Sequence, residues 1–353
     1  MNNRLVLAYS GGLKASAAIP SLIETHRAEV VAVAIDLGQG DDLAEIRHRA
    51  LSAGAVRCHV IDARDEFARD FVLPSLKADA LLDGRYPMAT ALGRPLIAKT
   101  LVTIARIEDA KTVAHAGTGA DHRRISGAVH DLDPTLKVVA CAESWHFTQS
   151  DLASIVGRHD VAVEGQSRVD RNLWGRTVGR WAEADAGDLP DGVFVLTRSP
   201  EGGADHDAHI EIEFANGVPT ALNGVAMPPA ELVESLTTIG AEHGIGRLHR
   251  IKSRQDNRVS HVFYEAPAAV LLHAAHQELQ RSLSPGAVLH FAPSVAAAYV
   301  DMIERGEWFS NLRPALDAFV NQIQQSVTGA IRLKLFKGSV TASGISQPAV
   351  AKS

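Results

Sequence analysis

A serine- and glycine-rich loop near the start of the chain has the residue types and spacing best suited to chemistry. Residues 8–16 read Ala-Tyr-Ser-Gly-Gly-Leu-Lys-Ala-Ser and directly follow the apolar run of residues 5–7. Glycine lets the backbone bend and approach a ligand, and residues 15–23 would open a helix whose free amides and positive dipole end face an anion. Ser10 and Ser16 add hydroxyl donors. The segment therefore predicts a phosphate-binding loop, and a plain tight turn is the alternative.

The spacing of this loop differs from two common nucleotide motifs. It is neither the Gly-x-x-x-x-Gly-Lys-Ser/Thr loop nor the Gly-x-Gly-x-x-Gly loop of dinucleotide-binding proteins. The pattern favours enzymes that cut ATP between its α and β phosphates. Lys14 would either contact a phosphate or point to water, and exposure is the more common outcome for lysine.

The composition narrows the class of protein. With 353 residues the chain is long enough for two domains, and its formal net charge of −6 gives no basic footprint for nucleic acid. Cys58 and Cys141 are its two cysteines and stand far apart, which disfavours a disulfide scaffold or a structural metal site. The sequence contains no run of about 18 apolar residues, so it does not predict a membrane span. We expect a cytoplasmic protein without a protein-bound metal.

The first part of the chain alternates strand and helix signals. Strand-like apolar runs cover residues 4–8, 30–35, 57–61 and 112–115, and helical spacing covers 15–24, 43–53, a stretch through residue 80 and about 95–109. Strands separated by helices predict an α/β fold, a parallel doubly wound sheet in a nucleotide-binding domain of residues 1–160. Ligands bind beyond the carboxyl ends of such strands, where Ser10, Asp36 and the loop Gly117-Thr118-Gly119 would lie.

The pattern changes after about residue 160. Strand signals at 193–196, 209–214 and 218–222, a hairpin turn at Asn216-Gly217, and helices at 229–239, 266–283 and 316–327 predict an α+β domain of residues 161–353. Residues 332–341 alternate like a strand. With little of its own domain to cover it, the segment 327–338 is expected to mediate oligomerisation. The tail 343–353 is expected to be mobile.

Short motifs along the whole chain resemble the argininosuccinate synthase family. From about residue 3 to 340 they occur in the family's order: Ala8-Tyr-Ser-Gly-Gly-Leu13, Asp36-Leu-Gly-Gln-Gly40, Gly84-Arg85-Tyr86, Arg94-Pro-Leu-Ile-Ala-Lys99, Asn172-Leu-Trp-Gly-Arg176, Tyr264-Glu-x-Pro267 and Lys334-Leu-x-Lys-Gly338. The resemblance implies a nucleotide-binding domain of the pyrophosphate-loop ATPase type and a synthetase and multimerisation domain. It also implies a homotetramer with a C-terminal arm, and an ATP-dependent carbon–nitrogen ligase that forms AMP and pyrophosphate.

The same resemblance implies cofactors and residue roles. The cofactors are ATP and Mg²⁺. Positions that match the family assign nucleotide binding to Ala8, Tyr9, Ser10, Gly11, Gly12, Ser16, Ala34, Asp36, Gly117 and Gly119. Catalysis is assigned to Ser10 and Ser16, which match the family, and to Lys14, which stands where the family has an aspartate. Substrate binding is assigned to Tyr86, Thr118, Arg123, Ser126, Thr177, Lys252 and Tyr264.

The amino acid positions depart from the family's pattern. The family's reaction adenylates citrulline and then joins it to aspartate; the Asn, Asp and Arg that hold these substrates align with His122, Arg123 and Ser126. Two family glutamates align with Gly179 and Lys252. Charge-assisted hydrogen bonds contribute about 1.5–3 kcal/mol each, so these changes predict weak binding of citrulline and aspartate. The added positive charge predicts a more anionic substrate.

Three function classes therefore remain open. The first is an active AMP-forming ligase whose substrates are not citrulline and aspartate, with ordinary argininosuccinate synthase as its alternative. The second is a catalytically silent relative that binds a nucleotide or a protein. The third, a tRNA-modifying enzyme, is disfavoured because the chain lacks cysteine pairs and an appended RNA-binding domain. The expected partners are small anionic substrates and further copies of this chain.

Other conspicuous side chains have plainer interpretations. His115, at a strand end, is expected to be a structural, hydrogen-bonded histidine rather than a general base. The run His122-Arg123-Arg124 fits a solvated loop as well as it fits a substrate site. The histidines within 243–249 and 273–276 are expected at the surface, and Trp174 and Trp308 are expected to be packing residues.

Overall fold

The chain divides into two compact units. The structure, a computed structural model, describes residues 3–141, 168–183, 192–253 and 258–346. Unit 1 comprises Met1–Arg64, Ala91–Gly165 and Asp301–Arg313, and unit 2 comprises Asp65–Thr90, Gln166–Val300 and Pro314–Ser353. Each unit takes segments from both sides of residue 160, and the domain boundary at that residue stays a prediction.

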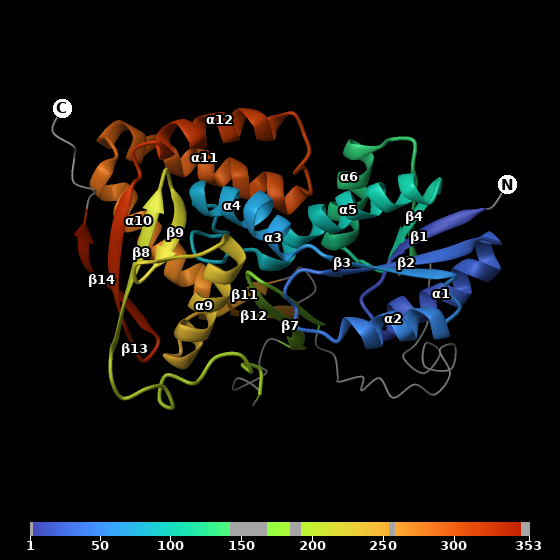
Figure 1. The fold of residues 1–353 in the computed structure, drawn as a ribbon, viewed down its shortest axis with the longest axis horizontal. Helices are drawn as coiled ribbons and strands as arrows, with labels where there is room; N and C mark the ends of the chain where they lie inside the picture. Colours follow the sequence, from blue (N-terminus) through green and yellow to red (C-terminus); the bar gives the residue numbers. More distant parts are fainter. Residues whose placement is uncertain (1–2, 142–167, 184–191, 254–257, 347–353) are drawn as a thin grey trace. The chain divides into compact units, whose positions relative to one another are not determined.

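Unit 1 is built on a parallel sheet with helices on both faces. Its strands are β1 (Arg4–Ala8), β2 (Glu29–Asp36), β3 (Arg57–Asp62), β4 (Thr112–His115) and β5 (Lys137–Ala140), in the order β3-β2-β1-β4-β5. Helices α1 (Leu13–His26) and α2 (Leu43–Ser52) lie on one face, and α5 (Ala89–Ile107) and α6 (Ala120–Leu132) lie on the other (Figure 1). All four strand pairings are parallel. The predicted doubly wound sheet is confirmed.

The central strands are apolar on both faces. Leu5, Val6 and Leu7 of β1 are buried, and so are residues 30–34 of β2. A strand with helices on both sides of its sheet buries every side chain, so it reads as a continuous apolar run rather than an alternating one. This explains the continuous apolar runs that predicted β1 and β2, whereas β5, which is not fully buried, was not predicted.

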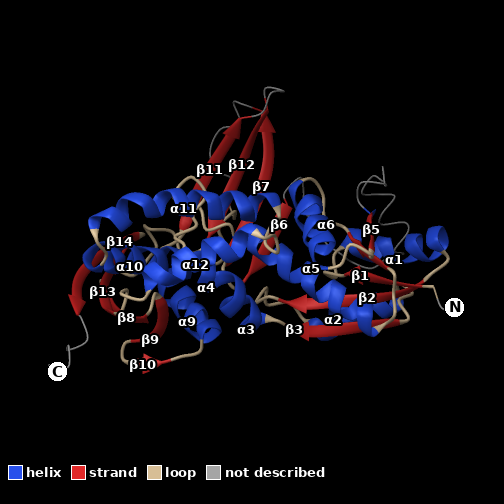
Figure 2. Ribbon diagram, turned by 90° about the horizontal axis from the view of Figure 1, so that it is seen from above, coloured by secondary structure: helices blue, strands red, loops and turns tan. Residues whose placement is uncertain are grey.

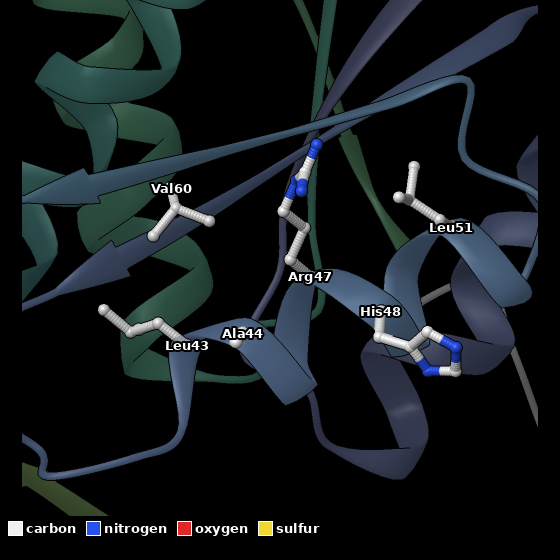
Figure 3. Close-up of a pocket in the computed structure, with 6 residues that line it drawn as sticks. All are labelled: Leu43, Ala44, Arg47, His48, Leu51 and Val60. Carbon is white, nitrogen blue, oxygen red and sulfur yellow. The ribbon is translucent and has the colours of Figure 1, made fainter.

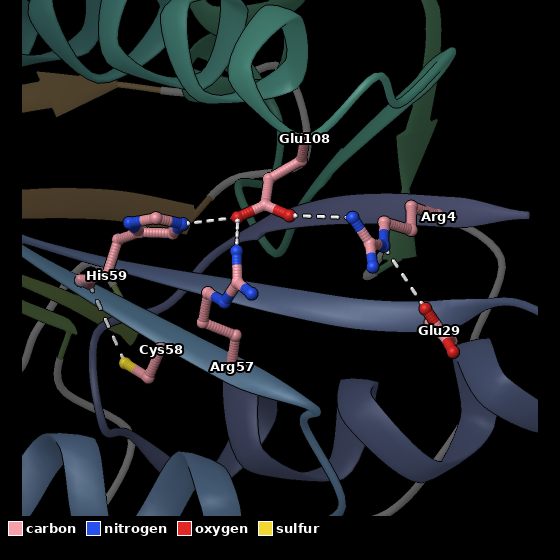
Figure 4. Close-up of polar contacts among 6 residues, drawn as sticks. All are labelled: Arg4, Glu29, Arg57, Cys58, His59 and Glu108. Carbon is pink, nitrogen blue, oxygen red and sulfur yellow. Dashed lines mark hydrogen bonds and ion pairs between the residues drawn. The ribbon is translucent and has the colours of Figure 1, made fainter. Parts of the chain in front are cut away.

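An ionic cluster closes the amino-terminal edge of the same sheet. Glu108, directly after α5, is 3% exposed, and its carboxylate accepts hydrogen bonds from Arg4 at 3.2 Å, Arg57 at 2.5 Å and His59 at 2.7 Å (Figure 4). Arg4 also pairs with Glu29 at 3.1 Å. Arg4 and Arg57 are the first residues of β1 and β3, so the cluster ties α5 to the edge opposite the carboxyl ends of the strands.

Unit 2 contains two antiparallel sheets. One has the order β11-β12-β7-β6 and consists of β6 (Arg168–Asn172), β7 (Gly175–Glu183), β11 (Arg247–Ser253) and β12 (Arg258–Glu265). Figure 2 shows β7, β11 and β12 side by side. The other has the order β10-β9-β8-β13-β14 and consists of β8 (Ala208–Ala215), β9 (Val218–Leu222), β10 (Val225–Ala226), β13 (Gly329–Phe336) and β14 (Ser339–Ser346). The predicted α+β character is confirmed.

Helices complete unit 2. They are α3 (Arg64–Phe67), the π-helical turn η1 (Ala68–Val72), α4 (Leu73–Lys77), α9 (Pro229–Glu242), α10 (Pro267–Leu283), α11 (Gly286–Arg305) and α12 (Leu312–Gln324). The end of α11 from Asp301 and the first two residues of α12 belong to unit 1. α9 packs against β9, and α10 packs against β13. Their buried faces supply much of the core of this unit, including Leu232, Leu236, Leu271 and Leu272.

The predicted strand at residues 193–196 is wrong. The backbone N–H groups of Leu196 and Thr197 donate to the carboxylate of Glu265 at 2.7 and 2.9 Å. Arg176 donates both to the carbonyl of Val193 and to Glu265, at 2.6 and 2.7 Å. Side chains therefore satisfy backbone groups that a strand would pair with its neighbour.

The alternating C-terminal segment is a hairpin rather than one strand. β13 and β14 pair antiparallel around Lys337 and Gly338, which both have positive φ. β13 lies between β8 and β14, and Ile331, Leu333 and Leu335 are fully buried. The expectation that its own unit leaves this segment uncovered is therefore wrong. Residues 343–346 end β14, and 347–353 lie outside the described residues.

Burial corrects the expectation for several histidines. His243 and His273 are each 4% exposed and His276 is 0% exposed, so these three side chains are not at the surface. Each lies near a helix that covers a sheet, where packing overrides the preference of histidine for water. Trp174 and Trp308 are each 1% exposed, which confirms their packing role.

Among the described helices, α11 alone is long and apolar enough to cross a membrane by length and composition. It has 20 residues, and its most apolar window has a mean hydropathy of 1.3 and is 28% buried. Pro293 interrupts its backbone bonding. A single helix of this kind is weak support for a membrane span, and its exposed apolar side chains include Phe291.

Candidate functional site

The glycine loop between β1 and α1 has the backbone of an anion-binding turn. Gly11 has φ +74°, and a Cβ atom there would lie 2.8 Å from Cγ1 of Ile46. Gly12 precedes α1 with φ −75°, no side chain caps the helix, and its first turn carries no acidic residue. The first amides of α1 are left for a ligand, and the helix dipole favours an anion beside them. The loop therefore fits the triphosphate of ATP.

The predicted side chains of this loop divide into two groups. Tyr9 and Ser16 are each 3% exposed, and their hydroxyl groups form a hydrogen bond of 2.7 Å. Burial raises the pKa of Tyr9, so its phenol stays protonated at neutral pH. Ser10 and Lys14 are exposed. In this structure Ser16 supports the loop from inside the unit, whereas Ser10 and Lys14 face solvent, and the roles assigned to all of them stay predictions.

The carboxyl end of β2 forms a second part of this edge. The carboxylate of Asp36 accepts the N–H of Gly38 at 2.8 Å, and its second oxygen lies 3.6 Å from Nε of Arg64. Ala34, two residues earlier, is buried. β2 is the direct neighbour of β1 in the sheet, so Asp36 ends one strand away from the glycine loop.

The turn after β4 is the third part. The N–H of Gly117 donates to Nδ1 of His115 at 3.1 Å, and Gly119, at φ +55°, begins α6. A Cβ atom at Gly119 would have nothing within 4 Å, which leaves room for a ligand above the backbone. Burial, followed by the nearby His122, lowers the pKa of His115 to about 4. The expectation of a hydrogen-bonded histidine is confirmed.

The basic run lies on α6 rather than in a loop. Arg124 is 7% exposed and binds Asp121 at 2.9 Å and Glu304 at 2.8 Å. Asp121 also pairs with Arg94 at 2.9 Å. Arg124 is therefore a structural ion-pair partner, while Arg123 is exposed. Sequence reasoning missed this network because Glu304 lies 180 residues further along the chain.

Unit 2 carries the remaining predicted substrate residues. In the sheet register Tyr264 lies opposite Thr177, and alternation places Gly179 on the same face as Thr177. The ring of Tyr86 stacks on Tyr264 with centroids 5.1 Å apart. Oγ1 of Thr177 is buried and has no hydrogen-bond partner among the described residues, so it is suited to meet a ligand. Lys252 lies in β11, and its side chain is outside the described part of the chain.

Arg250 is a neighbour of this group that sequence reasoning missed. Its Nε lies 2.8 Å from the carboxylate of Asp83, and its guanidinium lies 5.7 Å from the centroid of the Tyr86 ring. In the sheet register Arg250 of β11 lies opposite Val262 of β12, and Val262 lies opposite Gly179 of β7. An arginine two residues before Lys252 in an alternating strand was the available signal.

A shallow hollow on unit 1 lies apart from all these residues. It has a volume of about 300 Å³ between α2 and β3 and is lined by Leu43, Ala44, Arg47, His48, Leu51 and Val60 (Figure 3). None of its lining residues was predicted to act on a ligand, and Ile46 of the same helix points to the glycine loop instead.

Within the described residues no group of three or more histidine, cysteine, aspartate or glutamate side chains could hold a metal ion. Mg²⁺ in nucleotide enzymes is held largely by the substrate phosphates, with one or two carboxylates and water. A preformed metal cluster is therefore not required for MgATP, and Asp36 is one carboxylate at the edge where the phosphate loop lies, with Asp62 opposite it in β3.

Comparison with known proteins finds family models and relatives that match nearly the whole chain. A model of the arginosuccinate synthase N-terminal HUP domain matches residues 4–162, and a model of the arginosuccinate synthase C-terminal domain matches residues 167–350. Argininosuccinate synthase of Rubrobacter xylanophilus is 43% identical over 353 residues, which cover 98% of this chain and 86% of that protein. Argininosuccinate synthases of Symbiobacterium thermophilum and Pelotomaculum thermopropionicum are 41% and 40% identical, each over 98% of this chain and 88% of the relative.

A solved structure also overlaps part of the chain. It is the crystal structure of a predicted subunit of tRNA methyltransferase from Methanocaldococcus jannaschii, 15% identical, covering 44% of this chain and 75% of that chain with a TM-score of 0.30. This score is too low to support an inference about fold or function.

Proposed function

This chain belongs to the argininosuccinate synthase family, and we propose that it is an ATP-dependent ligase that adenylates citrulline and joins it to aspartate, with release of pyrophosphate and then AMP. The observation that carries the proposal is the identity of about two residues in five with named argininosuccinate synthases over nearly the full chain. The glycine loop supports the ATP half of the reaction. Its positive-φ Gly11 and uncapped α1 suit a triphosphate.

Each group of predicted site residues has a proposed role in this reaction. The amides of α1 hold the phosphates, with Ser10 and Lys14 as the exposed side chains beside them. Asp36 and Ala34 border the nucleoside. With Asp36 near the phosphates, bound Mg²⁺ would supply neutralisation of the phosphate charge. The amino acid substrates are assigned to residues of each unit: in unit 1 Thr118, Arg123 and Ser126, and in unit 2 Tyr86, Thr177, Lys252 and Tyr264.

A second candidate keeps the ATP chemistry and changes the acceptor. The positions that hold citrulline and aspartate in the family carry His122, Arg123 and Ser126 here, and Gly179 and Lys252 replace two glutamates under the same alignment. Exchange of acidic for neutral or basic groups favours a more anionic acceptor. The full-length identity favours the ordinary reaction, and the local substitutions favour this alternative.

Pyrophosphate exchange separates these functions. Purified protein with MgATP and citrulline should exchange labelled pyrophosphate into ATP, and addition of aspartate should yield argininosuccinate. Exchange with an anionic acceptor but not with citrulline would replace the first candidate by the second. No exchange with any acceptor, together with ATP binding by calorimetry, would leave a catalytically silent nucleotide-binding protein.

ATP binding has its own test. A Gly12→Asp variant puts a carboxylate at the start of α1, where it repels the triphosphate, so calorimetry should detect no binding of MgATP. Unchanged affinity would contradict the assignment of the phosphate site.

The assembly and the compartment are part of the proposal. We expect a cytoplasmic homo-oligomer, a tetramer, and light scattering of the full chain tests it. Phe291 of α11, 53% accessible and in edge-to-face contact with Phe319 of α12, is one exposed apolar side chain that could take part in a subunit contact. A monomer at micromolar concentration would contradict the expectation.

A further inference from the structure

Three side chains of unit 1 form a continuous hydrogen-bonded chain at the start of α6. Nε2 of His115 lies 3.2 Å from Oγ of Ser126, and the same Oγ lies 3.2 Å from Nδ1 of His122. The two imidazole rings are 5.4 Å apart. His115 is 1% exposed, whereas Ser126 and His122 are half-buried. A reactant at the surface can therefore reach the serine and the second histidine but not the first.

The direction of these hydrogen bonds follows from the backbone. The N–H of Gly117 can only donate, so Nδ1 of His115, 3.1 Å away, is the acceptor. A neutral imidazole then carries its proton on Nε2, which donates to Oγ of Ser126. The low pKa of His115, caused first by burial, keeps the ring neutral in this state. Because Oγ of Ser126 accepts the hydrogen bond from His115, the hydroxyl group of Ser126 donates its own proton to Nδ1 of His122.

The neighbouring charges are already paired. His115 ends β4, and Arg94 of α5 pairs with Asp121 of α6 at 2.9 Å. Asp121 in turn binds Arg124, which reaches Glu304 of α11. These ion pairs hold the first turns of α6 in place, so the His122–Ser126 contact does not depend on a flexible loop.

The position of the relay relates it to the proposed reaction. β4 pairs with β1 in the register Leu7↔Ala114, so His115 ends beside the strand that leads into the phosphate loop. The open space above Gly119 lies in the turn that joins His115 to α6. A group activated on the phosphate loop and an incoming amine would meet at this edge of the sheet.

We propose that Ser126 and His122 accept the proton of the amine substrate in the second half-reaction, and that His115 positions the serine for this transfer. The inference rests on the proposed function. An amine is largely an ammonium ion in neutral water and has no lone pair until a proton leaves. The N–H proton passes to Oγ of Ser126 while the serine proton passes to Nδ1 of His122. The freed lone pair forms the carbon–nitrogen bond, AMP leaves with the electron pair of its carbon–oxygen bond, and the remaining excess proton goes to water.

The test separates the two half-reactions in the full-length enzyme. In Ser126→Ala and His122→Gln variants, ligation to aspartate should fall by roughly 10²–10⁴-fold, the range of general-base catalysis, relative to any change in pyrophosphate exchange with citrulline alone. Hydroxylamine, whose nitrogen is unprotonated at pH 7, should restore turnover as the amine. Ser126→Thr keeps the hydroxyl group and should recover ligation. His130→Gln, an exposed substitution on the same helix, is the matched control.

Several outcomes would overturn the relay. Equal losses in both half-reactions, or no rescue by hydroxylamine, would reduce these residues to a structural support of α6. Unchanged ligation in Ser126→Ala would exclude them from proton transfer. If the parent enzyme shows no exchange with citrulline, the proposed function fails separately, and ¹⁵N NMR of the imidazoles decides the relay: it requires the Nε2–H form of His115 and a change at His122 in Ser126→Ala.

Discussion

The carboxylate of Glu108 is almost fully buried and faces three cationic or potentially cationic side chains. Burial by itself would raise its pKa, but hydrogen bonds from His59 and Arg57 outweigh that effect and hold the pKa of Glu108 below its usual value. Its side chain is 1% exposed, while those of Arg4 and Arg57 are 30% and 55% exposed. Because Arg4 and Arg57 are partly exposed, water can hydrate them when the carboxylate is removed. Glu108 therefore stabilises this edge of the sheet, but its loss should not prevent folding.

Replacement of Glu108 tests this cluster. Glu108→Gln keeps the shape but removes the charge, and we expect a loss of about 1–3 kcal/mol in the free energy of unfolding. Glu29→Gln removes the exposed partner of Arg4 and should change stability by less than about 0.5 kcal/mol. Urea denaturation of both variants measures the difference. Equal effects would show that the burial of Glu108 contributes nothing.

At the scale of elements, the junction of β1 and α1 sets the geometry of the phosphate loop. The fold of the loop requires glycine at one of its two adjacent glycine positions and not at the other. Gly11 has φ +74° and would press a Cβ atom on Ile46 of α2, whereas Gly12 has φ −75° and nothing closer than 3.5 Å to a Cβ atom. Gly11 is therefore needed by the fold of the loop, and Gly12 is compatible with alanine.

This difference predicts unequal effects of two alanine substitutions. Gly11→Ala should cost about 1–3 kcal/mol because it combines a strained backbone with a clash, and the displaced loop should bind ATP more weakly. Gly12→Ala should preserve both stability and ATP binding. Thermal unfolding and calorimetry with MgATP measure the two quantities. A tolerated Gly11→Ala would contradict the geometry assigned to the loop.

For each whole unit, buried neutral histidines link stability to pH. In unit 2, Nε2 of His276 lies 2.8 Å from Oε1 of Gln324, and the side-chain amide of Gln324 donates to the carbonyl of Lys77 at 3.0 Å. These two hydrogen bonds link helices α10, α12 and α4. Burial lowers the pKa of His276 to about 4. His115 of unit 1 has the same shift, to about 4.

These shifts predict a loss of stability in mild acid. The unfolded chain takes up protons on both histidines as the pH falls below about 6.5, while the folded chain resists until about pH 4, so unfolding is favoured progressively between these values. Each histidine accounts for up to roughly 3 kcal/mol. His276→Gln, which keeps a donor for Gln324, should flatten the pH dependence of the unfolding free energy.

The control for this experiment is His290→Gln, an exposed position on α11 that should leave the pH dependence unchanged. Denaturant unfolding at pH 7, 6, 5 and 4 on parent and both variants gives the comparison. A parental profile that is flat between pH 6.5 and 4 would show that the two imidazoles are not neutral in the folded protein.

Short-range patterns in the sequence determined the parallel sheet, the glycine loop and the family. The apolar runs of β1 and β2 and the helical spacing of α1 and α2 are local signals, readable within about ten residues, and the loop's glycines follow directly from the turn they must make. The order of the motifs along the chain was enough for the resemblance that the comparisons confirm. The change of substrate inferred from His122, Arg123 and Ser126 stays a prediction.

Only the tertiary structure decided where side chains from distant segments meet. Glu265 draws the backbone of Leu196 and Thr197 away from strand pairing, and Glu304 removes Arg124 from any role at the surface. Neither interaction can be read from the local sequence, because the partners are 68 or more residues apart. The free energy of these interactions comes from burial and hydrogen bonding in the folded state. The relay from His115 through Ser126 to His122 likewise exists only because β4 and α6 fold back on each other across the turn at Gly117 and Gly119.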